Sequence, residues 1–126
     1  MKGCARASLL GLASGLLVTL VPLSGAHADD PVVRLGVRDH RFEPSELEVP
    51  AGVKFKLIVH NYDPSPEEFE SVELRREKVV PGNDEVVVYI GPLKAGTYPF
   101  FGDFHQDTAQ GRMTAKEPGA VPAVSK

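Results

Sequence analysis

The feature that most constrains the fold of this 126-residue chain is an alternation of apolar and polar residues in short runs. Residues 33–37 carry Val, Leu and Val at every second position, and residues 55–59 carry Phe, Leu and Val in the same way. A period of two is typical of a β-strand with one buried face, and no long segment shows the helical period. The pattern therefore predicts an all-β protein.

About seven short strands are expected, since turn signals recur at a spacing of roughly 8–12 residues. Two of these turns contain Pro and Gly, at residues 50–52 and 81–83. We expect strands at residues 33–37, 47–49, 53–60, 72–80, 85–90, 97–101 and 112–116. This spacing indicates a Greek-key β-sandwich. The side chains predicted to face its core are Val33, Leu35, Val37, Phe55, Leu57, Val59, Val86, Val88 and Tyr98.

The first 28 residues have the pattern of a secretory signal peptide. Lys2 and Arg6 precede an apolar region, which ends in Ala26-His27-Ala28, a small-x-small cleavage signature. A retained membrane anchor is the alternative, but Gly, Ser and Pro interrupt the apolar region, and it is short for a span of about 20 residues. We therefore expect a periplasmic protein with a domain at residues 29–117 and a flexible tail at 118–126.

Cleavage would change the charge and the chemistry of the chain. The 98-residue mature form loses two of the fourteen basic residues and none of the seventeen acidic ones, which leaves a formal charge of −5. That charge argues against nucleic-acid binding. Cleavage would also remove Cys4, the single cysteine, and with it dithiol chemistry, a Cys nucleophile and thiolate-bound copper. No G-x-S-x-G motif is present, so no hydrolase signature is found.

Several stretches of the mature chain resemble cupredoxin domains. Residues 42–44 (F-x-P), residues 47–52 (L-x-V-x-A-G) and a strand ending at Asn61 are similar to the opening of that fold, and residues 98–105 to its closing motif. The resemblance implies a Greek-key β-sandwich of the cupredoxin type. It places Glu67 in the slot of the first His ligand, Gly102 in the Cys slot and His105 in the slot of the second His. A blue copper site needs the thiolate, so the resemblance implies the fold without that site.

A narrower resemblance concerns residues 67–71, 76–82 and 96–102, which look most like the cupredoxin-like proteins of EfeO-type and Ftr-type periplasmic iron uptake. It implies a protein that captures Fe(II), or helps to oxidise it, for delivery to a membrane iron permease. The implied cofactor is an iron or copper ion. Another periplasmic iron-binding protein is a further candidate partner, and a monomer or weak dimer is expected.

Five candidate metal ligands lie on two segments that such a fold brings to one end. They are Glu67, Glu68, Glu70, Asp103 and His105. Carboxylates with one imidazole suit iron, manganese or Cu(II) better than Cu(I). If residues 67–70 are extended, Glu68 and Glu70 share one face and Glu67 takes the other, and the sequence leaves open which set ligates.

Other interpretations remain at this point. His40 precedes Arg41 in a polar corner and His60 ends a strand on its outer side, so structural roles are expected for both. The chain could instead be a copper-binding or electron-transfer cupredoxin, although Gly102 in the Cys slot weighs against electron transfer. It could also be a metal-free interaction module that keeps only the sandwich.

Overall fold

The computed structural model describes Gly3 and residues 29–119, and residues 32–116 of it form a β-sandwich. The predicted signal peptide, apart from Gly3, and residues 120–126 of the predicted tail lie outside the described residues, so both remain predictions. In the part of the chain that is described, no helix has the length and apolar character needed to cross a bilayer.

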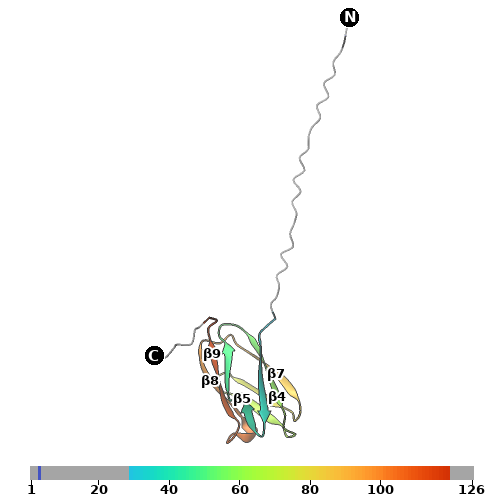
Figure 1. The fold of residues 1–126 in the computed structure, drawn as a ribbon, viewed down its shortest axis with the longest axis vertical. Coiled ribbons are helices and arrows are strands. Elements are labelled where there is room, and N and C mark those ends of the chain that lie inside the picture. Colours follow the sequence, from blue (N-terminus) through green and yellow to red (C-terminus); the bar gives the residue numbers. More distant parts are fainter. Residues whose placement is uncertain (1–2, 4–28, 120–126) are drawn as a thin grey trace.

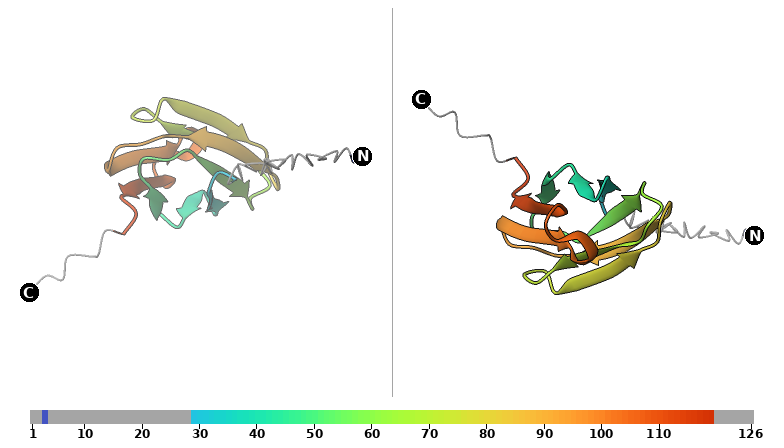
Figure 2. Two further views of the ribbon diagram at one scale, coloured as in Figure 1. Left: turned by 90° about the horizontal axis from the view of Figure 1, so that it is seen from above. Right: turned by 90° about the horizontal axis from the view of Figure 1, so that it is seen from below.

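Two sheets pack face to face (Figures 1 and 2). The first contains, in spatial order, β2 (Arg41–Glu43), β1 (Val32–Arg38), β4 (Phe55–Asn61) and β7 (Glu85–Ile90). The second contains β3 (Glu46–Pro50), β9 (Gln110–Lys116), β8 (Gly96–Gly102), β5 (Glu67–Ser71) and β6 (Arg76–Val80). Strand β1 runs parallel to β4 and β3 runs parallel to β9, and the other pairs are antiparallel.

The core between the sheets follows the predicted alternation. On β4, Phe55, Leu57 and Val59 are fully buried, and the residues between them are partly exposed. Six of the nine residues predicted to face the core are buried, and Val33, Val86 and Tyr98 are partly buried and pack against it. The predicted β-sandwich is therefore confirmed.

The strand boundaries differ from the prediction between residues 67 and 80. The sequence predicts a single strand over residues 72–80, but the structure has a turn at residues 72–75 that separates β5 from β6. Within the described residues there are nine strands rather than about seven. The sequence hides β5 because two of the three residues on its inner face, Glu67 and Ser71, are polar although buried.

Candidate metal centre

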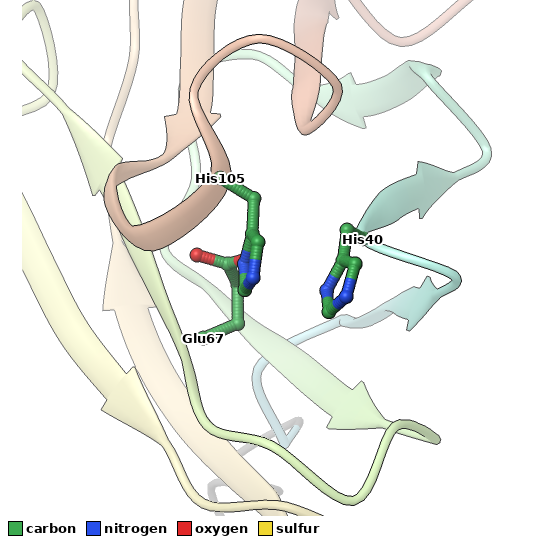
Figure 3. Close-up of side chains that lie close together, drawn as sticks. All are labelled: His40, Glu67 and His105. Carbon is green, nitrogen blue, oxygen red and sulfur yellow. The ribbon is translucent and has the colours of Figure 1, made fainter.

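Three side chains from separate elements meet at one end of the sandwich (Figure 3). His40 lies in the turn between β1 and β2, Glu67 is the first residue of β5, and His105 ends η1 (Asp103–His105), a single 3₁₀ turn after β8. One possible ligand atom from each residue lies within 4.8 Å of the others. These are the residues of the candidate metal centre.

Glu67 forms the buried base of this centre, with 1% of its surface exposed. Its Oε1 accepts hydrogen bonds from the backbone amides of Glu68 and Phe104, each at 3.0 Å. Its Oε2 lies 2.5 Å from Nδ1 of His105. The backbone therefore fixes one carboxylate oxygen, and the other is directed at an imidazole.

Gly102, the last residue of β8, leaves the space that this carboxylate fills. A Cβ built on Gly102 would lie 2.7 Å from Cδ of Glu67 and 2.7 Å from Cβ of Ala109, closer than real Cβ atoms approach. By the resemblance described above, position 102 is the slot of the copper-binding cysteine. The Glu67 carboxylate thus lies against the position from which a thiolate side chain would start.

His105 is partly exposed and is held by its own backbone. Its carbonyl oxygen accepts a hydrogen bond of 2.8 Å from the amide of Ala109, which closes the loop after η1. Its ring stacks on the ring of His40, with 3.6 Å between the centroids and 17° between the planes (Figure 3). Both imidazoles remain reachable from solvent, since their side chains are 28% and 44% exposed.

His40 occupies the second position of a two-residue hairpin loop, because Arg38 pairs with Arg41. Both loop residues have positive φ, 52° at Asp39 and 57° at His40. This combination matches the type I′ turn that hairpins favour, where Asn-Gly, Asp-Gly and Gly-Gly are the usual pairs. Asn and Asp tolerate this left-handed region, but most other side chains enter it at a cost of roughly 1–2 kcal/mol. A histidine at this position points to a use for its side chain.

Asp63 and Thr108 hold the turn in place. Oδ1 of Asp63 accepts the amide of Asp39 at 2.8 Å and Oδ2 accepts the amide of His40 at 2.9 Å. The hydroxyl of Thr108 donates to the carbonyl oxygen of His40 at 2.7 Å. Burial raises the pKa of Asp63, but the two amide hydrogen bonds and the charges of His40 and Arg38 outweigh it, so that its pKa lies below the ordinary value. Asp63 is therefore ionised at neutral pH.

The other predicted ligands do not join this cluster. Glu68 and Glu70 lie on the outer face of β5, where their carboxylates come within 4.8 Å of that of Glu77. Asp103 is exposed on η1 and accepts a hydrogen bond of 2.6 Å from the side chain of Gln106. Of the five residues predicted as ligands, the structure brings Glu67 and His105 together and sets the other three apart from them.

Sequence reasoning missed His40, for which it expected a structural role. The pairing of Arg38 with Arg41 leaves Asp39 and His40 as the two loop residues, and no sequence pattern indicated this close hairpin. His60, in contrast, lies outside the cluster and contacts Glu85, with 3.3 Å between Nδ1 and Oε2. That position agrees with the expected surface role of His60.

The donor set of the candidate centre is two imidazoles and one carboxylate. Imidazole suits copper, iron, zinc and nickel, and adding an oxygen donor favours Cu(II) or iron over Cu(I), which prefers thiolate and thioether ligands. The single cysteine of the chain, Cys4, lies in the predicted signal peptide. These residues therefore fit a transition-metal ion held without sulfur.

Comparison with known proteins identifies the family. The described region is a sandwich of the cupredoxin class, and a family model described as the cupredoxin-like domain matches residues 11–115. The chain therefore belongs to the cupredoxin-like domain family. The match identifies the family and gives no information about a role in iron uptake.

One relative shares much of this sequence. It is a protein of Rickettsia prowazekii (strain Madrid E) designated uncharacterized protein RP394, which is 51% identical over 79 residues. The aligned part is 63% of this chain and 63% of the relative, so the chain spans less than two thirds of that protein's length.

Solved structures share the fold at low identity. The metal-binding domain of the Cu(I)-exporting P-type ATPase CopA of Streptococcus pneumoniae D39 has a TM-score of 0.57 at 18% identity, and the match covers 68% of this chain and 85% of that domain. Auracyanin A, a "blue" copper protein of Chloroflexus aurantiacus, has a TM-score of 0.58 at 17% identity, with coverage of 68% and 98%. At these identities the matches establish the fold alone.

Proposed function

We propose that this chain is a metal-binding cupredoxin-like protein that holds Cu(II) at His40, Glu67 and His105. The observation that carries the proposal is the convergence of these three donors within 4.8 Å at one end of the fold. Structures with the same fold include a "blue" copper protein and the metal-binding domain of a Cu(I) exporter. The donors fit both Cu(II) and iron, and the copper-binding fold neighbours support the choice of copper.

The chemistry expected of such a centre follows from its lack of sulfur. The intense visible band of a blue copper site comes from a Cys–Cu(II) bond, and position 102 has no side chain. A bound copper ion would supply one-electron redox chemistry, and nitrogen and oxygen donors favour its Cu(II) state. We therefore propose copper binding or delivery rather than fast electron transfer.

Copper titration with matched variants tests this proposal. Calorimetry should show one Cu(II) bound per chain. Electron paramagnetic resonance should show nitrogen hyperfine structure, and the visible absorption spectrum should contain only weak bands. His105→Ala and His40→Ala should each weaken binding by more than the roughly 10–100-fold typical of losing an outer partner of a ligand. His60→Ala is the control, since His60 lies outside the cluster and should bind as wild type. Normal binding by both cluster variants would place the site elsewhere.

Iron handling is the second candidate, and one observation favours it. Two imidazoles with one carboxylate also form the donor set of non-haem Fe(II) sites. The three carboxylates of Glu68, Glu70 and Glu77 add hard oxygen donors on the outer face of β5 and its neighbour β6. In this proposal the protein captures Fe(II), or helps to oxidise it, and delivers it to a membrane permease. An anaerobic Fe(II) titration beside the Cu(II) titration separates the two ions.

Export is part of both proposals. The chain would be cleaved after Ala28 and would act in the periplasm, where a permease and another periplasmic iron-binding protein are the proposed partners. Intact-mass measurement on a periplasmic extract should give a mature form that begins at Asp29. A mass that retains residues 1–28 would favour the membrane-anchor alternative instead.

A further inference from the structure

The Asp39–His40 turn has a backbone conformation that is unusual at its second residue. Both residues have positive φ, and Asp is a usual first residue of such a turn, but its second residue is usually Gly and here is His. The turn conformation determines where the His40 ring lies. A contact from outside the turn that stabilises this conformation would therefore fix the position of the ring.

Asp63 supplies that contact from the loop after β4. Its two carboxylate oxygens each accept one amide of the turn, at 2.8 Å and 2.9 Å. The carboxylate is buried, with 8% of the residue exposed, and it is itself fixed, because its amide donates to Oδ1 of the fully buried Asn61 at 3.0 Å. Asn61 in turn donates to the carbonyl oxygen of Ser65 at 2.8 Å. A chain of hydrogen bonds thus connects the turn to the sandwich.

The position of Asp63 relative to His40 parallels that of Glu67 relative to His105. Oδ2 of Asp63 lies 3.6 Å from Nδ1 of His40, and Oε2 of Glu67 lies 2.5 Å from Nδ1 of His105. The two stacked imidazoles therefore each have a buried carboxylate on the Nδ1 side. The two differ in role, because Glu67 is itself a proposed ligand, whereas Asp63 approaches the His40 ring at 3.6 Å and forms its hydrogen bonds with the turn amides.

We propose that Asp63 is a positioning residue of the metal centre: by accepting both amides of the Asp39–His40 turn, its carboxylate selects the conformation that stacks His40 on His105. This inference rests on the proposed metal-binding function, which it deepens. Asp63 acts through His40 and touches no metal itself. Without it, the centre would keep Glu67 and His105 but lose its second imidazole.

The metal-free protein gives the first test. Nuclear Overhauser contacts between the ring protons of His40 and His105 should be present in the wild type and lost in Asp63→Asn, because the amide Nδ2 cannot accept the second backbone amide. Asp84→Asn is the matched control, since the exposed Asp84 side chain accepts the amide of the neighbouring Glu85 and bonds no other residue among those that the structure describes. That variant should keep the ring contacts. Ring contacts that persist in Asp63→Asn would overturn the inference, whatever the protein binds.

A rescue variant separates positioning from a general loss of structure. Gly at position 39 adopts positive φ without a Cβ penalty, so Asp39→Gly should restore part of the ring stacking in the Asp63→Asn background. If Asp63→Asn alone does not fold, this double variant replaces it in the comparison. A folded double variant without ring contacts would count against the selection of the turn conformation by Asp63.

Copper binding gives the second test. Asp63→Asn should weaken Cu(II) binding about 10–100-fold and reduce the nitrogen hyperfine pattern from two imidazoles to one. In the His40→Ala background the same substitution should cost no further affinity, because the residue that it positions is absent. An equal loss in both backgrounds would reject the role. If the wild type binds no copper, the proposed function fails, and the ring contacts of the metal-free protein still decide the role of Asp63.

Discussion

Glu67 and Glu68 are neighbours on β5, yet they lie in opposite environments. Glu67 faces inward, with 1% of its surface exposed, and its two carboxylate oxygens contact backbone amides and the imidazole of His105. Glu68 faces outward, where Glu70 and Glu77 place two more carboxylates beside it. Because successive side chains of a strand point to opposite faces, one acidic run is divided between two sites.

The difference shows what decides whether a carboxylate belongs to a built site. A buried carboxylate requires hydrogen-bond partners, so the inner position is matched by specific donors. The outer position is hydrated and tolerates like charges, and Glu70 even pairs directly with Glu77 across the β5–β6 ladder. The candidate metal centre is therefore distinguished by a buried carboxylate whose oxygens both have hydrogen-bond partners, and not by the number of acidic residues nearby.

The largest contrast between the two faces of β5 should appear in stability. Phe69 has no exposed surface and packs against Phe42 and Phe100, so Phe69→Ala should lower the free energy of unfolding by about 3–5 kcal/mol. Glu70→Ala, the next residue on the outer face, should change it by no more than about 0.5 kcal/mol. Urea denaturation of both variants measures this. Equal losses would mean that β5 does not have one buried and one solvated face.

Glu67→Gln tests the contrast between the buried carboxylate of Glu67 and the outward-facing carboxylate of Glu68. The amide keeps the size of the side chain but replaces one acceptor oxygen by a donor, which leaves a buried group without its partner. We expect a loss of about 1–3 kcal/mol in the free energy of unfolding and Cu(II) binding that is weaker by about 10–100-fold or more. Denaturation and calorimetry measure the two effects. A variant that is as stable as wild type and binds copper equally would remove Glu67 from the centre.

Gly102→Ala tests whether the residue beside the Glu67 carboxylate must lack a side chain. The added Cβ would lie 2.7 Å from both Cδ of Glu67 and Cβ of Ala109, and overpacking of this kind costs about 1–3 kcal/mol. Combining it with Ala109→Gly removes one of the two close contacts, so the remaining loss reports on Glu67. Normal stability of the single variant would contradict the close packing.

Much of the fold could be predicted because the core strands carry a clear alternation. On β1 and β4 the residues at every second position are apolar and buried, so the period is visible in the sequence. Strand β5 could not be predicted in the same way, since two of its three inward residues are polar. Its burial of Glu67 depends on the amide of Phe104, which is 37 positions away, and no local pattern records that partner.

The candidate centre could be predicted only in part for a similar reason. His105 and Glu67 fell in ligand slots of the family motifs, and the structure places them together. His40 lies in a tight turn far from those motifs in sequence. Its backbone is held by long-range hydrogen bonds, one accepted by Asp63 and one donated by Thr108, and its ring stacks on His105. Sequence spacing shows neither the turn conformation nor the partner that selects it.

The smallest expected effect comes from the outer face and depends on pH. Partial burial and the neighbouring carboxylates, Glu77 foremost, raise the pKa of Glu68 above its ordinary value of 4.5. A raised pKa in the folded state means that the protonated form is favoured by folding, so this contribution is complete below pH 4.5 and is lost as the pH rises through the folded-state pKa. At neutral pH the ionised Glu68 therefore destabilises the fold slightly.

Glu68→Gln should raise the urea midpoint at pH 7 by a small amount, and the gain should disappear near pH 4. Glu73→Gln is the control for a mutated surface carboxylate, because Glu73 lies in the exposed turn after β5, outside the cluster of Glu68, Glu70 and Glu77. A gain from Glu68→Gln that is the same at both pH values would mean that charge repulsion does not separate the outer face from the inner one.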